Sequence, residues 1–161
     1  LFAPVPVPQA TIIADAARQA GLTATLLGGV DWSRAEPADG LTGAVSVADF
    51  HPERDDEATR AFVEAYREAY GSIPSAAAAL AYDGLQRLLL AVEGTVASGR
   101  FDAGDVGATR TALQALLRQA GEYQGVTGRW WMEAPDRARK TVPIVRLDVG
   151  EPPAATYLGD F

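Results

Sequence analysis

Residues 1–29, LFAPVPVPQATIIADAARQAGLTATLLGG, decide the fold class. Residues 1–3 are typical of a strand end, since the alternate prolines that follow cannot sit in a central sheet ladder. An apolar repeat predicts a helix over residues 9–20, with Gly21 as its C-terminal cap. The apolar side of this helix is formed by Ile12, Ile13, Ala16 and Ala20. Residues 23–27 are the next short apolar strand, so the order is that of a βαβ unit in a parallel sheet.

The rest of the chain continues to mix helices and strands. We expect helices over residues 55–70, 76–97 and 109–120, and strands over residues 41–47, 129–133 and 141–149. The last two strands are expected to be joined by the polar turn at residues 134–139. Ser75 is the expected N-cap of the second helix. Its expected buried stripe consists of Leu80, Leu85, Leu88, Leu89 and Val92.

Composition excludes several classes of function. The chain has 161 residues, 48% of them hydrophobic, which is typical of a globular protein. Its 14 basic and 21 acidic residues give a net charge of -7 and are not segregated, so nucleic acid is not an expected partner. No cysteine is present, which leaves no disulfide or thiolate metal site. No apolar run approaches the length needed to span a membrane.

No catalytic or cofactor motif is found, and we expect a protein that is not an enzyme. His51 is the only histidine and lies in the acidic stretch of residues 51–57, whose carboxylates are expected to complement the N-terminus of the following helix. The pair Gly28 and Gly29 lacks the third glycine and immediate helix of a dinucleotide fingerprint. We therefore expect no cofactor and no metal ion.

Two places are candidates for binding a small molecule. Asp31 and Trp32 follow a predicted parallel strand, at the end where open α/β sheets bind ligands. The carboxylate suits an ammonium group and the indole an apolar or cationic one, although an ordinary surface turn fits the same residues. The N-terminus of the helix after Ser75 offers a weak anion site. Close packing through its alanines is the favoured alternative there.

Read in order, several stretches resemble the C-terminal half of type I periplasmic solute-binding proteins, the branched-chain amino acid (Leu/Ile/Val) binding family of ABC transporters. These stretches are IIADAARQAGL (12–22), LLGGVDW (26–32), FVEAYREAYG (62–71), Pro74 with AYD (81–83), and GVTG (125–128). The resemblance implies an α/β fold that is part of a two-lobed protein, with parallel sheets flanked by helices in Rossmann-like lobes. Residues 1–48 and 126–161 would belong to the C-terminal lobe and residues 49–125 to the N-terminal lobe. The N-terminal half of such a protein would be absent.

The resemblance also implies a site. In amino-acid binders of this family, an acidic residue directly after the glycine pair commonly holds the solute's ammonium group, and the N-terminal half holds its carboxylate. Here Val30 takes that position and Asp31 comes next, so the solute is expected to be an amino acid or an aromatic or other organic acid. The predicted ligand-binding residues are Asp31, Trp32, Phe50 near a lobe crossing, and Ala77 at a helix entry.

The expected function is therefore solute binding, by lobe closure, for an ABC importer with a membrane permease as partner. The expected location is periplasmic or extracellular, with a lipid anchor as one option. Alternatives are the ligand-sensing domain of a receptor or regulator, a small flavodoxin-like or Rossmann-like enzyme, and a truncated remnant that binds nothing by itself. The isolated chain is expected to self-associate through exposed sheet edges.

Overall fold

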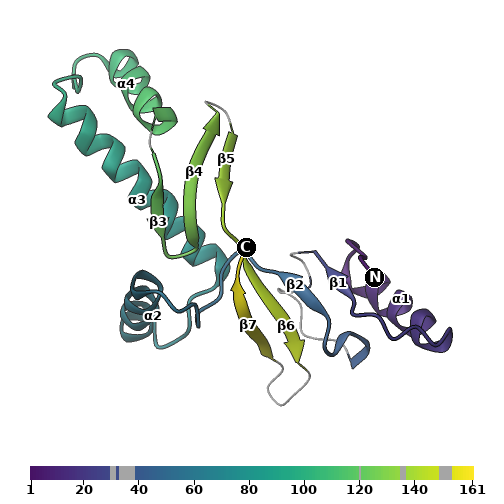
Figure 1. Ribbon diagram of the computed structural model, residues 1–161. Coiled ribbons are helices and arrows are strands. Elements are labelled where there is room, and N and C mark those ends of the chain that lie inside the picture. The colour runs from purple at the N-terminus through teal and green to yellow at the C-terminus, as the bar shows by residue number, and fades with distance from the viewer. Residues whose placement is uncertain (30–31, 33–38, 120, 135–136, 149–153) are drawn as a thin grey trace. The chain divides into compact units, whose positions relative to one another are not determined.

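The chain forms two compact units in the computed structural model, which describes residues 1–29, 32, 39–119, 121–134, 137–148 and 154–161 (Figure 1). Unit 1 comprises residues Leu1–Asp55 and Val142–Phe161, and unit 2 comprises Asp56–Thr141. The chain therefore passes between the units twice, after residue 55 and after residue 141. The assignment of segments to the two lobes of a larger protein, with its expected borders at 48/49 and 125/126, stays a prediction.

Unit 1 is built on one mixed sheet. Its elements are α1 (Val7–Gln19), β1 (Leu27–Gly28), the short 3-10 helix η2 (Asp39–Leu41), β2 (Val45–Val47), β6 (Pro143–Asp148) and β7 (Ala154–Asp160). The strand order is β1-β2-β6-β7. β1 and β2 are parallel, whereas β6 pairs antiparallel with both β2 and β7. Sequence analysis did not predict β7.

The βαβ unit at the start of the chain is confirmed. Phe2 forms a parallel bridge with Leu27, so the chain segments before and after α1 run in the same direction. The first strand is reduced to this single bridge, and β1 is shorter than expected. α1 begins after Pro6 and buries Ala10 and Ala14. The expected apolar side of this helix was partly wrong, because Ile12 is 69% exposed.

Unit 2 consists of three helices and an antiparallel hairpin sheet. Its elements are α2 (Glu57–Tyr70), α3 (Ala76–Ala97), α4 (Val106–Gln119), β3 (Tyr123–Gly125), β4 (Gly128–Ala134) and β5 (Arg137–Lys140). The strand order is β3-β4-β5, and both pairs are antiparallel. The three helices are confirmed within two or three residues of their predicted bounds.

The helix starts follow from local chemistry. The Asp56 side chain caps α2 by accepting the Thr59 amide at 2.9 Å, as expected from the acidic stretch before it. The Ser75 hydroxyl caps α3 by accepting the Ala78 amide at 3.2 Å, and this cap was predicted. α2 ends at Gly71, whose φ of 68° is a left-handed conformation that favours glycine.

The predicted pairing of the two late strands was wrong. Residues 137–139 were expected in a polar turn, but residues 137–140 form β5 and pair with β4. The strand after them, β6, lies in the sheet of unit 1. β5 was not predicted because its charged sequence RARK is more typical of a turn. Arg137 and Arg139 both bond the Glu133 carboxylate, at 3.2, 3.0 and 3.1 Å, so cross-strand ion pairs support an exposed hairpin. The bonds from Arg139 and then Arg137 lower the pKa of Glu133.

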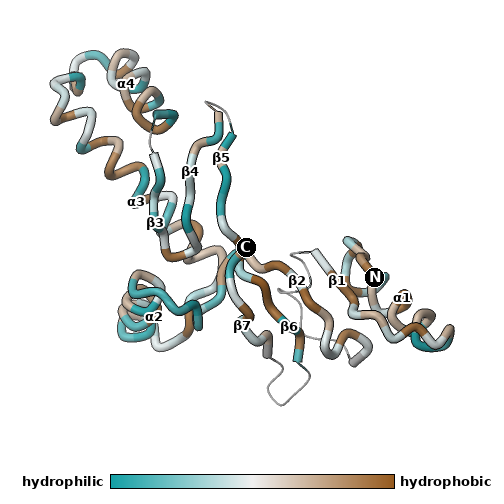
Figure 2. The backbone as a smooth tube through the Cα atoms, viewed as in Figure 1, coloured by the Kyte–Doolittle hydropathy of each residue, from teal (hydrophilic) through white to brown (hydrophobic). Residues whose placement is uncertain are grey.

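The expected buried stripe of α3 is largely exposed. Leu85, Leu88 and Leu89 are 55%, 44% and 45% exposed. The buried residues of α3 are instead Ala79, Asp83, Ala91 and Thr95. Figure 2 shows apolar residues along α3, in contrast to the hydrophilic β5. A helix that is apolar on several faces is typical of a buried position. Within the described residues, however, no other element packs fully over Leu85, Leu88 and Leu89.

Candidate functional site

The loop after β1 is held by its glycine pair. Gly28 is in contact with the indole of Trp32, since a Cβ at this position would lie 2.1 Å from two ring atoms. A Cβ on Gly29, in contrast, would meet nothing within 4 Å. The Ser46 hydroxyl on β2 donates to the carbonyl oxygen of Gly29 at 2.6 Å. The first half of the loop is thereby fixed to the end of the parallel pair β1 and β2.

Trp32 is bonded to Gly29 and to the chain segment before α1. Its amide donates to Gly29 O at 3.1 Å, and its indole Nε1 donates to Val5 O at 2.7 Å. The side chain is 1% exposed and belongs to the core of unit 1. That core comprises Ala3, Ala10, Ala14, Trp32, Leu41, Ala44 and Leu147. Within unit 1, Trp32 is therefore an anchor of the loop.

Asp31, the predicted partner of an ammonium group, lies outside the described residues. Val30 lies outside them as well, so the nearest described residues are Gly29 and Trp32. These two are joined by the Trp32 N to Gly29 O bond. The carboxyl end of a parallel strand, where this loop begins, is a common position for a ligand-binding side chain in α/β proteins.

The other two predicted residues occupy different units. Phe50 follows β2 in unit 1, before the crossing at residue 55, and is 7% exposed. Ala77 lies in the first turn of α3 in unit 2 and is exposed. A small side chain on a first helical turn leaves the helix N-terminus, with its partial positive charge, open to an anion. None of these positions is tested as a ligand contact, and they stay predictions.

Two of the family-like motifs meet in unit 2. The Asp83 carboxylate on α3 is 1% exposed and accepts the amides of Val126 and Thr127 at 2.8 and 2.9 Å, and the Thr127 hydroxyl at 2.6 Å. A Cβ on Gly125 would lie 2.5–2.6 Å from this carboxylate. The motifs AYD and GVTG are thus joined by a buried hydrogen-bond cluster between α3 and the β3–β4 turn. We name this cluster of Asp83, Val126 and Thr127 the lock. Sequence analysis quoted both motifs but did not predict their contact.

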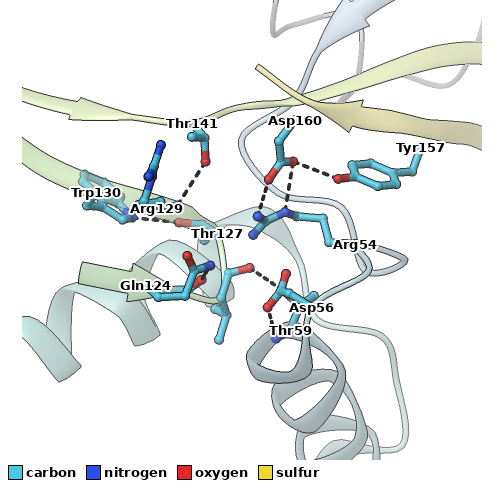
Figure 3. Close-up of polar contacts among 12 residues, drawn as sticks. Arg54, Asp56, Thr59, Gln124, Thr127, Arg129, Trp130, Thr141, Tyr157 and Asp160 are labelled. Atoms are coloured by element: carbon cyan, nitrogen blue, oxygen red, sulfur yellow. Dashed lines mark hydrogen bonds and ion pairs between the residues drawn. The ribbon is translucent and has the colours of Figure 1, made fainter. Parts of the chain in front are cut away.

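Further bonds extend this lock to α2 and β4. The Thr59 hydroxyl donates to Val126 O at 2.9 Å and also contacts Asp56. The Trp130 indole donates to the Thr127 hydroxyl at 3.3 Å, as Figure 3 shows. Tyr123 lies close to Asp83. Burial and then the negative charge of Asp83 raise the pKa of the Tyr123 phenol. We interpret Asp83 as structural, since its oxygens are occupied by backbone and hydroxyl donors.

A second polar cluster, which we name the β7 clamp, consists of His51, Arg54, Tyr157 and Asp160 in unit 1. The Arg54 guanidinium is 5% exposed and binds Asp160 with two nitrogens, Nε at 3.1 Å from Oδ1 and Nη2 on Oδ2 (Figure 3). The Tyr157 hydroxyl donates to Asp160 at 3.0 Å. Burial and then the Asp160 carboxylate raise the pKa of Tyr157 above its usual value.

His51 completes the β7 clamp. Its Nδ1 accepts the Glu53 amide at 3.2 Å, which leaves Nε2 to donate to Ala155 O at 2.7 Å. Its ring also stacks on Tyr157, with centroids 5.7 Å apart. His51 is thereby bound to β7, while the helix cap is supplied by Asp56. The sequence carries no local signal for this cluster, because its bonded partners are more than 100 residues apart.

Within the described part of the chain, no group of three or more His, Cys, Asp or Glu side chains is placed to hold a metal ion. The same residues include no helix that is long and apolar enough to cross a membrane.

Comparison with known proteins decides the family. A family model described as periplasmic binding protein matches residues 2–151. The chain belongs to the periplasmic binding protein family. This is a family of binding proteins, so the expectation of a chain that is not an enzyme is confirmed. A search of curated proteins gives no match.

Solved structures of periplasmic binding proteins share the fold. A leucine-binding protein from Thermotoga maritima is 25% identical with a TM-score of 0.71, and the match covers 99% of this chain and 43% of that one. A substrate-binding protein of an ABC transporter from Desulfitobacterium hafniense, in complex with Leu, is 28% identical with a TM-score of 0.70, covering 98% and 42%. A solute-binding protein from R. palustris, in complex with benzoate, is 21% identical with a TM-score of 0.64, covering 99% and 42%.

These matches confirm the predicted fold class, an α/β chain that corresponds to part of a type I periplasmic binding protein. The chain spans less than half the length of each of the three solved proteins.

Proposed function

We propose that the chain is part of the solute-binding component of an ABC importer, which acts outside the cytoplasm and delivers its solute to a membrane permease. We place the lobe borders of such a two-lobed protein at 55/56 and 141/142 instead of the expected 48/49 and 125/126, with unit 1 in the C-terminal lobe and unit 2 in the N-terminal lobe. The solute would be an amino acid or a similar small organic acid, bound as the lobes close.

The observation that carries this proposal is the anchored loop after β1. Its glycine pair and Trp32 are fixed to the sheet and the core, and Asp31 comes between them in the sequence. Loops at the carboxyl ends of parallel strands are where α/β proteins bind small ligands. A carboxylate at this place would pair with the ammonium group of an amino acid. Ala77, at the exposed start of α3, stays a further predicted ligand contact.

The solved relatives support the choice of solute class. Solved structures of such proteins contain leucine, isoleucine or benzoate as the ligand. All three ligands carry a carboxylate next to an apolar group, whereas only the first two carry an ammonium group. We therefore propose that the solute has a carboxylate, and that Asp31 distinguishes an amino acid from an aromatic acid.

A thermal-shift screen tests this function. Leucine, isoleucine, valine and benzoate are added separately to a two-lobed protein that contains this chain. A ligand that binds only the folded state raises the melting temperature increasingly with its concentration. We expect at least one of the four to do so, whereas NAD and FMN leave the melting temperature unchanged. A shift with a nucleotide cofactor and none with the four acids would contradict the proposal and favour a Rossmann-like enzyme.

A further inference from the structure

Both connections between the units leave unit 1 beside the end of β7. The return connection enters unit 1 at Val142, whose amide donates to Phe161 O at 2.9 Å and whose carbonyl accepts the Phe161 amide at 3.0 Å. The outgoing connection runs from the end of β2 to Asp55. Near its start, the Ala48 amide donates to Pro143 O at 2.8 Å and so joins it to the return connection.

The β7 clamp fixes the remainder of the outgoing connection. Arg54 is the second-last residue of unit 1 before the crossing, and it is bound to Asp160, the neighbour of Phe161. His51 is bound further back, at Ala155 and on the ring of Tyr157. Residues 160 and 161 therefore hold the outgoing chain through a side-chain pair and the returning chain through a backbone pair.

We propose that the β7 clamp positions a hinge: together with the backbone bonds of Val142 and Ala48, it makes residues 48–54 and 142–143 part of the rigid body of unit 1, so that bending is confined to the crossings at 55/56 and 141/142. Arg54 and Asp160 are positioning residues in this account, because they act through the two connections. Hinges of this kind consist of a few residues that absorb the change in backbone angles. The inference deepens the proposed function, on which its consequence for solute affinity rests.

Burial explains why a side-chain pair can have this effect. Arg54 is nearly inaccessible to water, with 6% of its side chain exposed, and Asp160 is only 26% exposed. Loss of the carboxylate removes the two-nitrogen contact of a nearly buried guanidinium, so its segment is expected to be held less tightly against β7. The Arg18–Asp15 pair of α1 has side chains 61% and 53% exposed, and breaking it should have little effect.

The experiment measures the distance between the units without any solute. Because the chain has no cysteine, Gln19→Cys on α1 and Arg118→Cys on α4 accept one spin label each. The labelled chain is diluted with unlabelled chain, so that pulsed electron resonance records only distances within one molecule. We expect Asp160→Asn and Arg54→Met to widen the distance distribution about twofold, because the hinge then extends back into residues 52–54.

Three comparisons make the result decisive. Asp15→Asn, which breaks the exposed pair, should leave the width unchanged, and Arg54→Lys should give an intermediate width. Tyr157→Phe removes one bond to Asp160 and provides a milder variant if the others do not fold. A clamp that is merely structural would lower the melting temperature of these variants without widening the distribution, and that outcome overturns the inference.

The two proposals can fail separately. A widened distribution in a protein that binds none of the tested acids would leave the hinge intact and reject the proposed function. An unchanged width in a protein that binds leucine or benzoate would reject only the hinge. If both hold, the same substitutions should alter the affinity for that solute severalfold, because the free energy difference between open and closed states is changed.

Discussion

Individual residues determine how the candidate site is held. Trp32 lies in the core of unit 1, and Gly28 is required beneath its indole because a Cβ would collide with the ring. Trp32 is thus a core residue of unit 1, and its predicted contact with the ligand stays a prediction. Asp31 is the other predicted ligand-binding residue of this sequence segment. Its carboxylate is expected to pair with the ammonium group of an amino acid.

The first prediction concerns Asp31. In the two-lobed protein, Asp31→Ala should weaken leucine binding about tenfold or more, because the solute's ammonium group loses a charged partner in a desolvated site. Calorimetric titration gives the affinity. Asp15→Ala removes an exposed carboxylate of the same unit and should change nothing. Equal leucine affinity in the wild type and in Asp31→Ala would remove Asp31 from the site.

The second prediction concerns the lock around Asp83. Gly125→Ala should destabilise the protein by about 1–3 kcal/mol, because the new Cβ overlaps a carboxylate that three donors hold in place. Gly84→Ala on α3 is the matched control, since its Cβ meets nothing within 4 Å. It should stabilise the helix by about 0.5–1 kcal/mol. Urea unfolding measures both, and effects of the same sign would refute this account of the lock.

At the level of elements, local signals predicted the helices better than the strand pairings. The caps at Asp56 and Ser75 lie next to the helices that they start, so both helix starts could be read from the sequence. β5 was missed because its charges resemble a turn, and β7 because no pattern in the sequence shows that it pairs with β6. The β7 clamp joins residues about 100 positions apart, which only the folded chain brings together.

α3 provides the prediction at this scale. Its exposed stripe of Leu85, Leu88 and Leu89 should make the 161-residue chain self-associate, because such apolar patches mark binding surfaces. Leu85→Glu should shift the chain toward the monomer in light scattering. The control Gln114→Glu adds the same charge at an exposed position of α4 and should not. A monomeric wild-type chain would show that this stripe does not drive association.

For the molecule as a whole, two units joined by two connections are the physical basis of the proposed function. A solute that contacts both lobes favours the closed state by its difference in affinity for the closed and open forms. Neither composition nor motif spacing revealed the borders at 55/56 and 141/142, because they depend on which distant residues pack together. The fold class, in contrast, followed from the βαβ order and the family-like motifs.

Small-angle X-ray scattering tests the central claim, solute capture by closure, most directly. A two-lobed protein that contains this chain is measured without solute and with saturating leucine, or with benzoate if the thermal-shift screen selects it. The account predicts a smaller radius of gyration with the solute. An unchanged radius in a sample that calorimetry shows to be saturated would contradict it.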